Sequence, residues 1–258
     1  RHMNHAVGTT HDSLANVAAL TARSVVEDSF AKELLNWVGA FEFIPYAVMP
    51  TNANYIRSHA FCRIKIANDD KNVSPLSLKT RIVLHGNEDN QKDEVRKDTQ
   101  AASFTAIRIL LTLSALHKFH IASLDIKGAY LQSGPCKRYV FVRPPNEWPG
   151  ARGVVWKLLK LPYGLPDAGH QWQVVIDDFL FELDFIIVPG IPQLFLHRNV
   201  SNNIDADIAK VIDDILIGAS SSVTAWFVQQ LKSQFDVGRV VVNENMHFNG
   251  SFISVSAD

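Results

Sequence analysis

Two stretches of the chain show apolar residues spaced three and four positions apart, as in an amphipathic helix. Over residues 103–119 the spaced positions are Phe104, Ile107, Leu110, Leu111 and Ser114/Ala115. Over residues 169–185 they are Trp172, Val175, Ile176, Phe179, Leu180 and Leu183. The pattern therefore predicts two helices that each pack one face against a core.

A shorter helix is predicted near the start of the chain, after a loose lead-in. Asp28 or Ser29 can serve as its N-cap, and Gly39 marks its end. The expected apolar face consists of Phe30, Leu34, Trp37 and Val38.

Alternation of apolar and polar residues predicts strands elsewhere. Residues 59–67 and 78–86 form a long β-hairpin in this interpretation, with a polar linker between them. Its one basic face, which either lies in solvent or contacts phosphate groups, carries Arg63, Lys65, Lys79 and Arg81. Further strands are expected over residues 120–130 and 139–145. Strands and helices follow one another in mixed order, which predicts an α+β layered fold.

Composition narrows the class of protein only slightly. The 258 residues are 47% hydrophobic, so a sizeable core is expected. The net charge is −1, whereas nucleic-acid binders usually carry a basic excess, so any such role requires local clusters of basic residues. Cys62 and Cys136 form no metal-binding or disulfide pattern. No apolar stretch approaches the ~20 residues that a membrane-spanning helix needs.

The tetrapeptide VIDD occurs twice. In the copy at 175–178, Asp177 and Asp178 fall off the helical stripe and are expected on a solvated helix face. In the copy at 211–214, short apolar runs flank the acids, which predicts a β-hairpin with Asp213 and Asp214 at its tip. Such a tip is either an ordinary polar turn or an anchored pair of metal ligands.

A third acid favours the metal site. Asp125 ends a predicted strand among apolar neighbours, and two adjacent strands would bring it next to Asp213. Closely spaced carboxylates repel one another, and a divalent cation relieves that repulsion. Paired Mg²⁺ sites of this kind are suited to phosphoryl transfer.

The motifs SLDIKGAYLQ, KLPYGLPDAGHQW and KVIDDILIG occur in this order along the chain. Their order and spacing resemble those of the reverse transcriptase of copia-type (Pseudoviridae) LTR retrotransposons. The resemblance covers about residues 29–252. It implies a right-hand polymerase fold, with an antiparallel palm sheet backed by helices and a thumb that is absent or incomplete. The implied division is a lead-in over 1–28, fingers over 29–99 and 133–166, and palm to primer grip over 100–132 and 167–258.

The same resemblance implies roles for individual residues. Asp125, Asp213 and Asp214 would bind two Mg²⁺ ions, or Mn²⁺ instead, together with the backbone carbonyl of Ile126. Tyr130 would act as a steric gate against the ribose 2′-OH of a nucleotide. The other implied dNTP-binding residues are Lys79, Arg81, Tyr163 and Gly164, and the implied primer grip consists of His247, Phe248, Asn249 and Gly250.

Activity, partners and location follow from the resemblance as expectations. The chain is expected to be an RNA-directed DNA polymerase fragment that acts on an RNA template, a DNA primer, their hybrid and dNTPs. The rest of the Pol polyprotein, with integrase and ribonuclease H, is the expected protein partner, and no membrane is involved. The expected location is the cytoplasm, in a virus-like particle, with the nucleus as the alternative.

One departure from the family pattern leaves alternatives open. Val211 stands where the family usually has an aromatic residue in a YxDD box. A first alternative is therefore a catalytically inactive remnant that still binds nucleic acid. A second is a metal-dependent nuclease, for which His117 and His120 are the nearby candidates for a general base.

Overall fold

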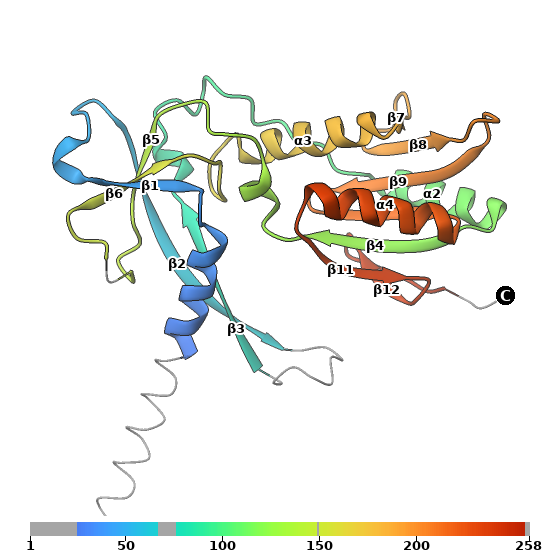
Figure 1. The fold of residues 1–258 in the computed structure, drawn as a ribbon, viewed down its shortest axis with the longest axis horizontal. Coiled ribbons are helices and arrows are strands. Elements are labelled where there is room, and N and C mark those ends of the chain that lie inside the picture. The colour runs from blue at the N-terminus through green and yellow to red at the C-terminus, as the bar shows by residue number, and fades with distance from the viewer. Residues whose placement is uncertain (1–24, 67–75, 149, 256–258) are drawn as a thin grey trace, which may run out of the picture. The chain divides into compact units, whose positions relative to one another are not determined.

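A computed structural model describes residues 25–66, 76–148 and 150–255, and the chain divides into two compact units (Figure 1). Unit 1 consists of Arg1–Asn90 and Cys136–Leu165, and unit 2 consists of Gln91–Pro135 and Pro166–Asp258. The predicted boundary after residue 99 therefore lies further along the chain than the one in the structure. Most of the predicted lead-in over 1–28 lies outside the described residues.

Unit 1 is built on a five-stranded sheet. Its order is β1 (Phe41–Pro45), β6 (Val154–Leu158), β5 (Val140–Arg143), β2 (Asn54–Ile66) and β3 (Leu76–Leu84). Strands β2 and β5 pair in parallel, and the other neighbours pair antiparallel. The predicted long hairpin is confirmed as β2 and β3, although β2 begins five residues before the predicted start at 59. Short 3-10 turns occur at η1 (Tyr46–Val48) and η2 (Gly86–Glu88).

The first helix of unit 1 extends further toward the N-terminus than predicted. Residues 25–36 are helical, so Asp28 and Ser29 lie inside the helix and cannot cap it. The Ser29 hydroxyl instead donates to the Leu78 carbonyl at 3.2 Å and accepts from the Thr80 backbone N–H at 3.0 Å, which ties the helix to β3. Val38 is exposed because the helix ends before it.

Unit 2 is built on a six-stranded antiparallel sheet. The strand order is β11 (Val237–Val242), β4 (His120–Ile126), β10 (Asp214–Ala219), β9 (Ile204–Val211), β8 (Leu194–Arg198) and β7 (Ile186–Ile187). A separate hairpin pairs β12 (Met246–Phe248) with β13 (Ser251–Ile253). The helices are α2 (Phe104–His117), α3 (Ala168–Glu182) and α4 (Ser221–Gln234). The predicted α+β class is confirmed.

Helices cover both faces of this sheet, as Figure 1 shows. On one face, α3 and α4 pack on a cluster that includes Leu124, Ile126 and Ile215. On the other face, α2 and the β12–β13 hairpin pack on a cluster that includes Leu216. Because successive strand residues point to opposite faces, the side chains of Asp125 and Asp214 lie on the α2 face.

The two predicted helical stripes form as expected, except that Phe104 and Ala115 are exposed. Ser103 caps α2 by accepting a hydrogen bond from the Ala106 backbone N–H at 3.1 Å. Ile107 and Leu110 are buried, whereas Phe104 in the first turn is exposed. In the part of the chain that the structure describes, no helix is long and apolar enough to cross a bilayer.

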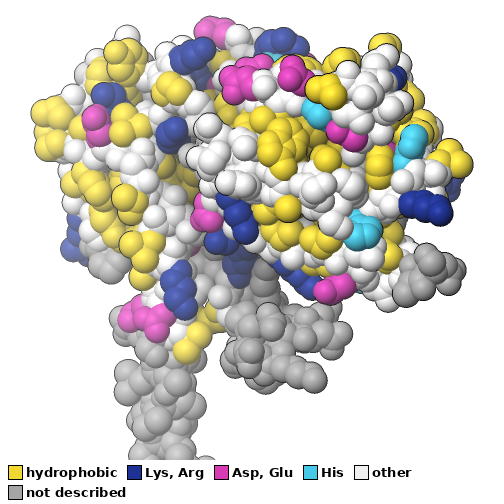
Figure 2. Space-filling view, turned by 45° about the vertical axis from the view of Figure 1, so that its right-hand side comes forward, with side chains coloured by type: hydrophobic (Ala, Val, Ile, Leu, Met, Phe, Trp, Pro, Cys, Tyr) yellow, Lys and Arg dark blue, Asp and Glu magenta, His cyan; other side chains and the backbone are white. Residues whose placement is uncertain are grey.

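Charged side chains are mixed on the surface. On the face drawn in Figure 2, Lys and Arg occur in several separate groups, with Asp and Glu between them. This agrees with the net charge of −1 and means that attraction to a polyanion depends on local groups on this face.

Candidate active site

The second VIDD copy forms the predicted β-hairpin, but its turn differs. Val211 pairs with Asp214, so the two-residue turn consists of Ile212 and Asp213, and Asp214 is the first residue of β10. The predicted Asp213–Asp214 tip is therefore wrong by one residue. As a result, only Asp214 takes its place in the alternation of the strand, whereas Asp213 projects from the turn.

The turn holds a β-branched residue in an unfavourable backbone conformation. Ile212 has φ +54°, in the left-handed region that β-branched residues avoid. Such a conformation costs of order 1–3 kcal/mol and persists only where the surroundings hold it. Here the Trp172 indole N–H of α3 donates to the Ile212 carbonyl at 2.9 Å, and the Ile126 backbone N–H donates to the Asp213 carbonyl at 3.0 Å.

Strand pairing brings the predicted acids together. Strands β4 and β10 are neighbours, and Asp125 stands directly opposite Asp214. Residues opposite each other in an antiparallel pair have Cβ atoms ~4.5–5.5 Å apart and share a face. Asp213 adjoins this pair through its turn and through its bond to Ile126. Asp125 and Asp214, which are 89 residues apart in the sequence, thus meet at one end of the sheet.

The acids influence one another electrostatically. Burial, together with the negative charges of Asp213 and Asp125, raises the pKa of Asp214 to about 6. Three neighbouring carboxylates repel one another, and a bound divalent cation would reduce this repulsion.

The donor chemistry therefore fits a Mg²⁺ site, since hard cations prefer carboxylate and carbonyl oxygens. Among the described residues, no three His, Cys, Asp or Glu side chains already form a group arranged to hold a metal ion. The side chain of Ile126 is buried in the core, which leaves only its backbone for the predicted metal contact. Metal binding by Asp125, Ile126, Asp213 and Asp214 remains a prediction.

A glycine on the neighbouring strand leaves room for Asp125. A methyl group on Gly238 of β11 would lie 2.5 Å from Oδ2 of Asp125, which is closer than any ordinary contact. The register between β11 and β4 shifts between Val237 and Val240, so Gly238 lies at an irregularity of the strand pair. Gly238 is not among the residues predicted from the sequence, although a glycine inside a strand commonly marks a bulge or a close approach.

Tyr130, the predicted steric gate, lies in unit 2 beside the acids. It belongs to η3 (Ala129–Gln132), which follows the turn after β4. Gly128 makes this turn with φ +55°. Burial raises the pKa of Tyr130, and the charge of Asp213 raises it further. The ring thus lies within electrostatic reach of the hairpin.

The remaining predicted dNTP residues lie in unit 1. Lys79 and Arg81 lie on the same face of β3, where Lys79 is opposite Arg63 and Arg81 is opposite Phe61. The register therefore supports the predicted basic face, except that the Lys65 side chain lies outside the described residues. The Arg81 guanidinium lies 5.1 Å from the centre of the Tyr163 ring.

Gly164 is required where it stands. Its φ is +101°, and a Cβ there would collide with the backbone carbonyl of Leu84. Next to it, the Tyr163 carbonyl accepts a hydrogen bond from the Leu84 backbone N–H at 3.0 Å. Arg81, Tyr163 and Gly164 thus lie close together in unit 1, and their contact with a dNTP stays a prediction.

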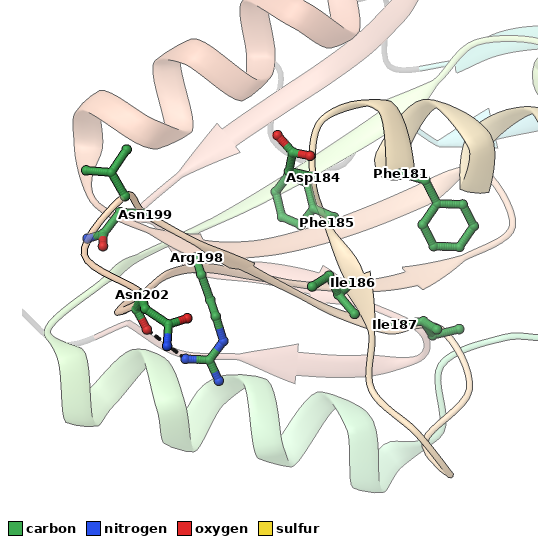
Figure 3. Close-up of a pocket in the computed structure, with 9 residues that line it drawn as sticks. Phe181, Asp184, Phe185, Ile186, Ile187, Arg198, Asn199 and Asn202 are labelled. Carbon is green, nitrogen blue, oxygen red and sulfur yellow. Dashed lines mark hydrogen bonds between the residues drawn. The ribbon is translucent and has the colours of Figure 1, made fainter.

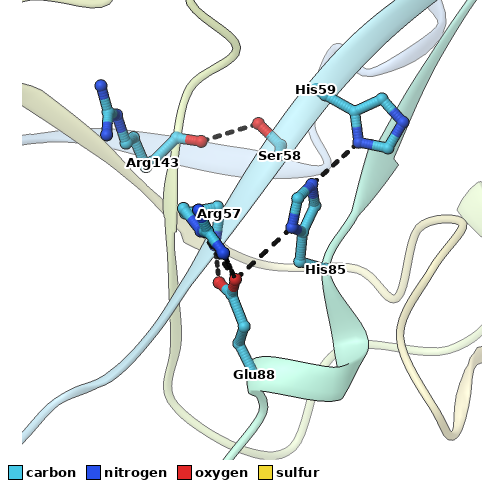
Figure 4. Close-up of polar contacts among 6 residues, drawn as sticks. All are labelled: Arg57, Ser58, His59, His85, Glu88 and Arg143. Atoms are coloured by element: carbon cyan, nitrogen blue, oxygen red, sulfur yellow. Dashed lines mark hydrogen bonds and ion pairs between the residues drawn. The ribbon is translucent and has the colours of Figure 1, made fainter.

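A polar cluster occupies the end of the β2–β3 hairpin (Figure 4). Arg57 donates from its backbone and its guanidinium to Glu88, and this ion pair lowers the pKa of Glu88 to about 2. His85 lies 3.4 Å from Glu88, and its other ring nitrogen is 2.9 Å from His59. This cluster connects β2 to the segment after β3, and a structural role accounts for it.

The predicted primer-grip residues form a hairpin in unit 2. Asn249 and Gly250 make the two-residue turn between β12 and β13, with φ +46° and +74°, as in a type I′ turn. His247 is exposed beside the Phe252 ring, whereas Phe248 is buried in the core. Only the His247 side chain and the turn are therefore available to a ligand.

Of the two acids in the first VIDD copy, only one lies on the predicted solvated helix face. Asp178 is exposed, as predicted. Asp177, however, lies 3.1 Å from the ammonium of Lys210, whose side chain is only 1% exposed. This pair is not predicted from the sequence, although Lys210 within the apolar run before the second VIDD is a signal of a buried charge.

The two histidines proposed for a nuclease lie away from the acids. His120 begins β4 and pairs with Ala219, whereas Asp125 near the other end pairs with Asp214. Five residues of strand separate His120 from Asp125, which is roughly 17 Å. His117 stacks on Phe119 at 5.1 Å. Neither histidine can serve as a base for a water at Asp125, so this requirement of the nuclease alternative is not met.

A cavity of about 590 Å³ lies at the other end of β9 (Figure 3). It is lined by Phe181, Phe185, Ile186 and Ile187 on its apolar side, and Arg198 donates to the Asn202 carbonyl at its rim. The hairpin turn that holds Asp213 is at the opposite end of the same strand. This cavity is therefore separate from the candidate active site.

A comparison with known families identifies the chain. A family model described as reverse transcriptase (RNA-dependent DNA polymerase) matches residues 48–250. One solved structure that resembles this chain is a foamy viral protease-reverse transcriptase in complex with double-stranded DNA. The match covers 89% of this chain and 34% of the viral chain, with a TM-score of 0.48 and 12% sequence identity.

Curated relatives are Pol polyproteins of transposons. The retrovirus-related Pol polyprotein from transposon TNT 1-94 of Nicotiana tabacum is 28% identical over 62% of this chain. That from transposon RE1 of Arabidopsis thaliana is 26% identical over 69%. The chain spans only 12% of the length of each. Since the family match extends over more than half of the chain, the predicted resemblance is confirmed: the protein belongs to the reverse transcriptase family of copia-type retrotransposons.

Proposed function

We propose that this chain is an RNA-directed DNA polymerase domain that transfers nucleotidyl groups from dNTPs to the 3′-OH of a primer. The observation that carries the proposal is the pairing of Asp214 with Asp125 next to the turn that holds Asp213. The mutual influence of these carboxylates on the pKa of Asp214 supports it. Membership of the reverse transcriptase family supports it independently.

In this proposal the acids hold two divalent cations. Asp125, Asp213 and Asp214, with the Ile126 carbonyl, would bind Mg²⁺, or Mn²⁺ in its place. When bound, the ions supply positive charge for the attacking and leaving oxygens of an in-line displacement. With a pKa of about 6, Asp214 is mostly ionised at neutral pH and available as a ligand. The Trp172 and Ile126 hydrogen bonds hold the hairpin, so the carboxylates are positioned before substrate arrives.

Other residues would bind the nucleotide and the primer. Arg81 or Lys79 would neutralise the triphosphate, because a guanidinium or ammonium pairs strongly with phosphate oxygens. Tyr163 and Gly164 would line the nucleotide pocket, and Tyr130 would exclude a ribose 2′-OH. The hairpin of His247, Phe248, Asn249 and Gly250 would contact the primer backbone through His247 and its turn.

The proposed partners are those of a copying enzyme. An RNA template, a DNA primer and their hybrid would be held through backbone and shape, because base pairing carries the sequence information. The chain would act as part of a Pol polyprotein that also carries integrase and ribonuclease H. Its proposed location is the cytoplasm, within a virus-like particle, with the nucleus as the alternative.

Primer extension tests the proposal. A labelled DNA primer on an RNA template is incubated with the chain, dNTPs and Mg²⁺, and extension is compared with that of Asp125→Asn. We expect extension by the wild-type chain and a loss of roughly 10³-fold or more in the variant, since a metal ligand is removed. Circular dichroism should show that both proteins are folded. Extension by Asp125→Asn at the wild-type rate would overturn the metal assignment.

The main alternative is an inactive remnant that binds nucleic acid. Val211 favours it, because the usual aromatic ring at this position is missing. A folded wild-type chain that binds an RNA–DNA hybrid but extends no primer would establish this alternative.

The steric-gate role has its own test. Tyr130→Val removes the ring beside Asp213, so we expect ribonucleotides to be incorporated more readily relative to dNTPs, by about tenfold or more. Single-nucleotide incorporation with dNTP and rNTP gives the ratio. An unchanged ratio would remove Tyr130 from the proposed nucleotide site.

A further inference from the structure

A buried ion pair lies next to the turn of the β9–β10 hairpin in unit 2. Lys210 in β9 is three residues before Asp213, and its side chain is 1% exposed. Its ammonium lies 3.1 Å from Oδ1 of Asp177 in α3. Burial lowers the pKa of Lys210, and the charge of Asp177 opposes that shift. A buried pair of this kind gives little net stability compared with apolar residues, so stability alone does not explain it.

The pair is held in a polar network. Oδ2 of Asp177 accepts hydrogen bonds from the side-chain amides of Gln173 and Gln193, both at 3.3 Å. The backbone of Lys210 is held too, since its N–H donates to the Gln193 carbonyl at 3.1 Å and its carbonyl accepts from Ala102 at 2.8 Å. Lys210 is therefore fixed by its side chain and its backbone at once.

Helix α3 reaches the hairpin at two points. Asp177 holds the side chain of Lys210, and Trp172 donates to the Ile212 carbonyl at 2.9 Å. The two attachments stand on either side of Val211, where β9 ends and the turn begins. The Lys210 side chain and the Asp214 carboxylate lie on opposite faces of the sheet, because Lys210 shares a face with Ile208 of the α3-side cluster.

We propose that the Lys210–Asp177 ion pair positions the β9–β10 hairpin, so that Asp213 and Asp214 meet Asp125 in a metal-binding arrangement. The proposal rests on the polymerase function proposed above. Both residues act through the hairpin backbone and touch no substrate, so they are positioning residues. Charged hydrogen bonds are directional, whereas an apolar contact in the same place would allow the strand end to slide along α3.

Three variants separate positioning from stability. Lys210→Met and Asp177→Leu each leave a buried charge without its partner and should lower the melting temperature. The double variant Lys210→Met/Asp177→Leu replaces both charges with apolar groups and should recover most of that loss. Lys97→Met is the matched control, because it removes the exposed Lys97–Asp93 pair, which lies 2.8 Å apart, by the same substitution.

Hydrogen exchange over residues 208–217 gives the readout of positioning. In the double variant we expect these amides to exchange about tenfold faster than in the wild type, although the melting temperature is recovered. We also expect kcat for primer extension to fall about tenfold with KM for dNTP unchanged, because the reacting geometry is disturbed and nucleotide binding is not. The Lys97→Met control should match the wild type in both.

The outcomes are distinguishable. Wild-type exchange over 208–217 in the double variant would overturn the positioning role and leave an ordinary ion pair. Because exchange needs no substrate, it decides this question even if the wild-type chain extends no primer and the proposed function fails. Should the double variant not fold, Asp177→Asn supplies the same readout, since it keeps the shape of the side chain; normal hairpin exchange in that variant would likewise overturn the proposal.

Discussion

The two VIDD tetrapeptides have the same four residues and opposite surroundings. At 175–178 the letters lie in α3, where Ile176 is buried, Asp178 is exposed and Asp177 pairs with Lys210. At 211–214 they form the end of β9, a two-residue turn and the start of β10. There the isoleucine is partly exposed at φ +54°, and Asp214 faces Asp125. The identity of an acid therefore says little about its role until its neighbours are known.

The two copies are also in contact through Lys210. Asp177 of the first copy neutralises the lysine that precedes the second. The two copies of the repeat are thus physically connected, because an acid of the first supports the segment that carries the acids of the second.

The largest expected difference between the copies is in activity. Asp213→Asn removes a proposed metal ligand and should lower primer extension by roughly 10³-fold or more, equivalent to about 4 kcal/mol. Asp178→Asn makes the same change in the first copy on an exposed helix face and should leave extension within about twofold of the wild type. Equal effects of the two substitutions in a steady-state extension assay would break the comparison.

Replacing the isoleucine of each copy by glycine should affect stability very differently. Ile176→Gly empties a fully buried position and weakens α3, so we expect a loss of roughly 3–5 kcal/mol. Ile212→Gly relieves a left-handed β-branched residue, so we expect a change within about 1 kcal/mol. Urea denaturation measures both. A loss at Ile212 as large as that at Ile176 would mean that the isoleucine side chain, and not the backbone, holds the turn.

Asp207 on β9 shows how burial affects another carboxylate of the same sheet. Asp207 is fully buried, and its pKa is raised to about 7, because burial outweighs the lowering effect of hydrogen bonds such as the one from the Ser114 hydroxyl. The folded state therefore binds a proton that the unfolded state has released, so stability falls as pH rises from about 4 to about 7.

Asp207→Asn should remove this pH dependence. We expect the variant to gain stability over the wild type as pH increases, by no more than about 4 kcal/mol above pH 7, with little difference near pH 4. Urea denaturation from pH 4 to pH 8 measures the difference. A constant difference across this range would show that Asp207 does not titrate within it.

Stabilisation by Mg²⁺ is expected to be small. At a Mg²⁺ concentration ten times the dissociation constant, the wild type should gain about 1.4 kcal/mol, seen as a melting-temperature increase of a few degrees. The gain should persist in Asp178→Asn and vanish in Asp213→Asn. It should be larger at pH 8 than at pH 5.5, because protons compete with the cation at Asp214, whose pKa is about 6. A gain in Asp213→Asn equal to that of the wild type would argue against a metal site at the hairpin.

Much of the fold could be predicted from local pattern. The stripes of α2 and α3, the β2–β3 hairpin and the β9–β10 hairpin all follow from the spacing of apolar residues within one element. Errors fell at element ends, as with Ser29 inside the first helix and the turn at Ile212–Asp213. Ends depend on contacts with other segments, such as the hydrogen bonds between Ser29 and β3, which the local pattern does not contain.

The sequence by itself determined the family and the candidate acids, because the order and spacing of motifs along one chain carry that information. Only the tertiary structure decided that Asp214 stands opposite Asp125, that Gly238 leaves room for Asp125, and that Asp177 neutralises Lys210. The physical reason is that strand register and burial join segments far apart in the chain. The charge state of a side chain, its backbone strain and its contacts depend on the neighbours that these distant segments provide.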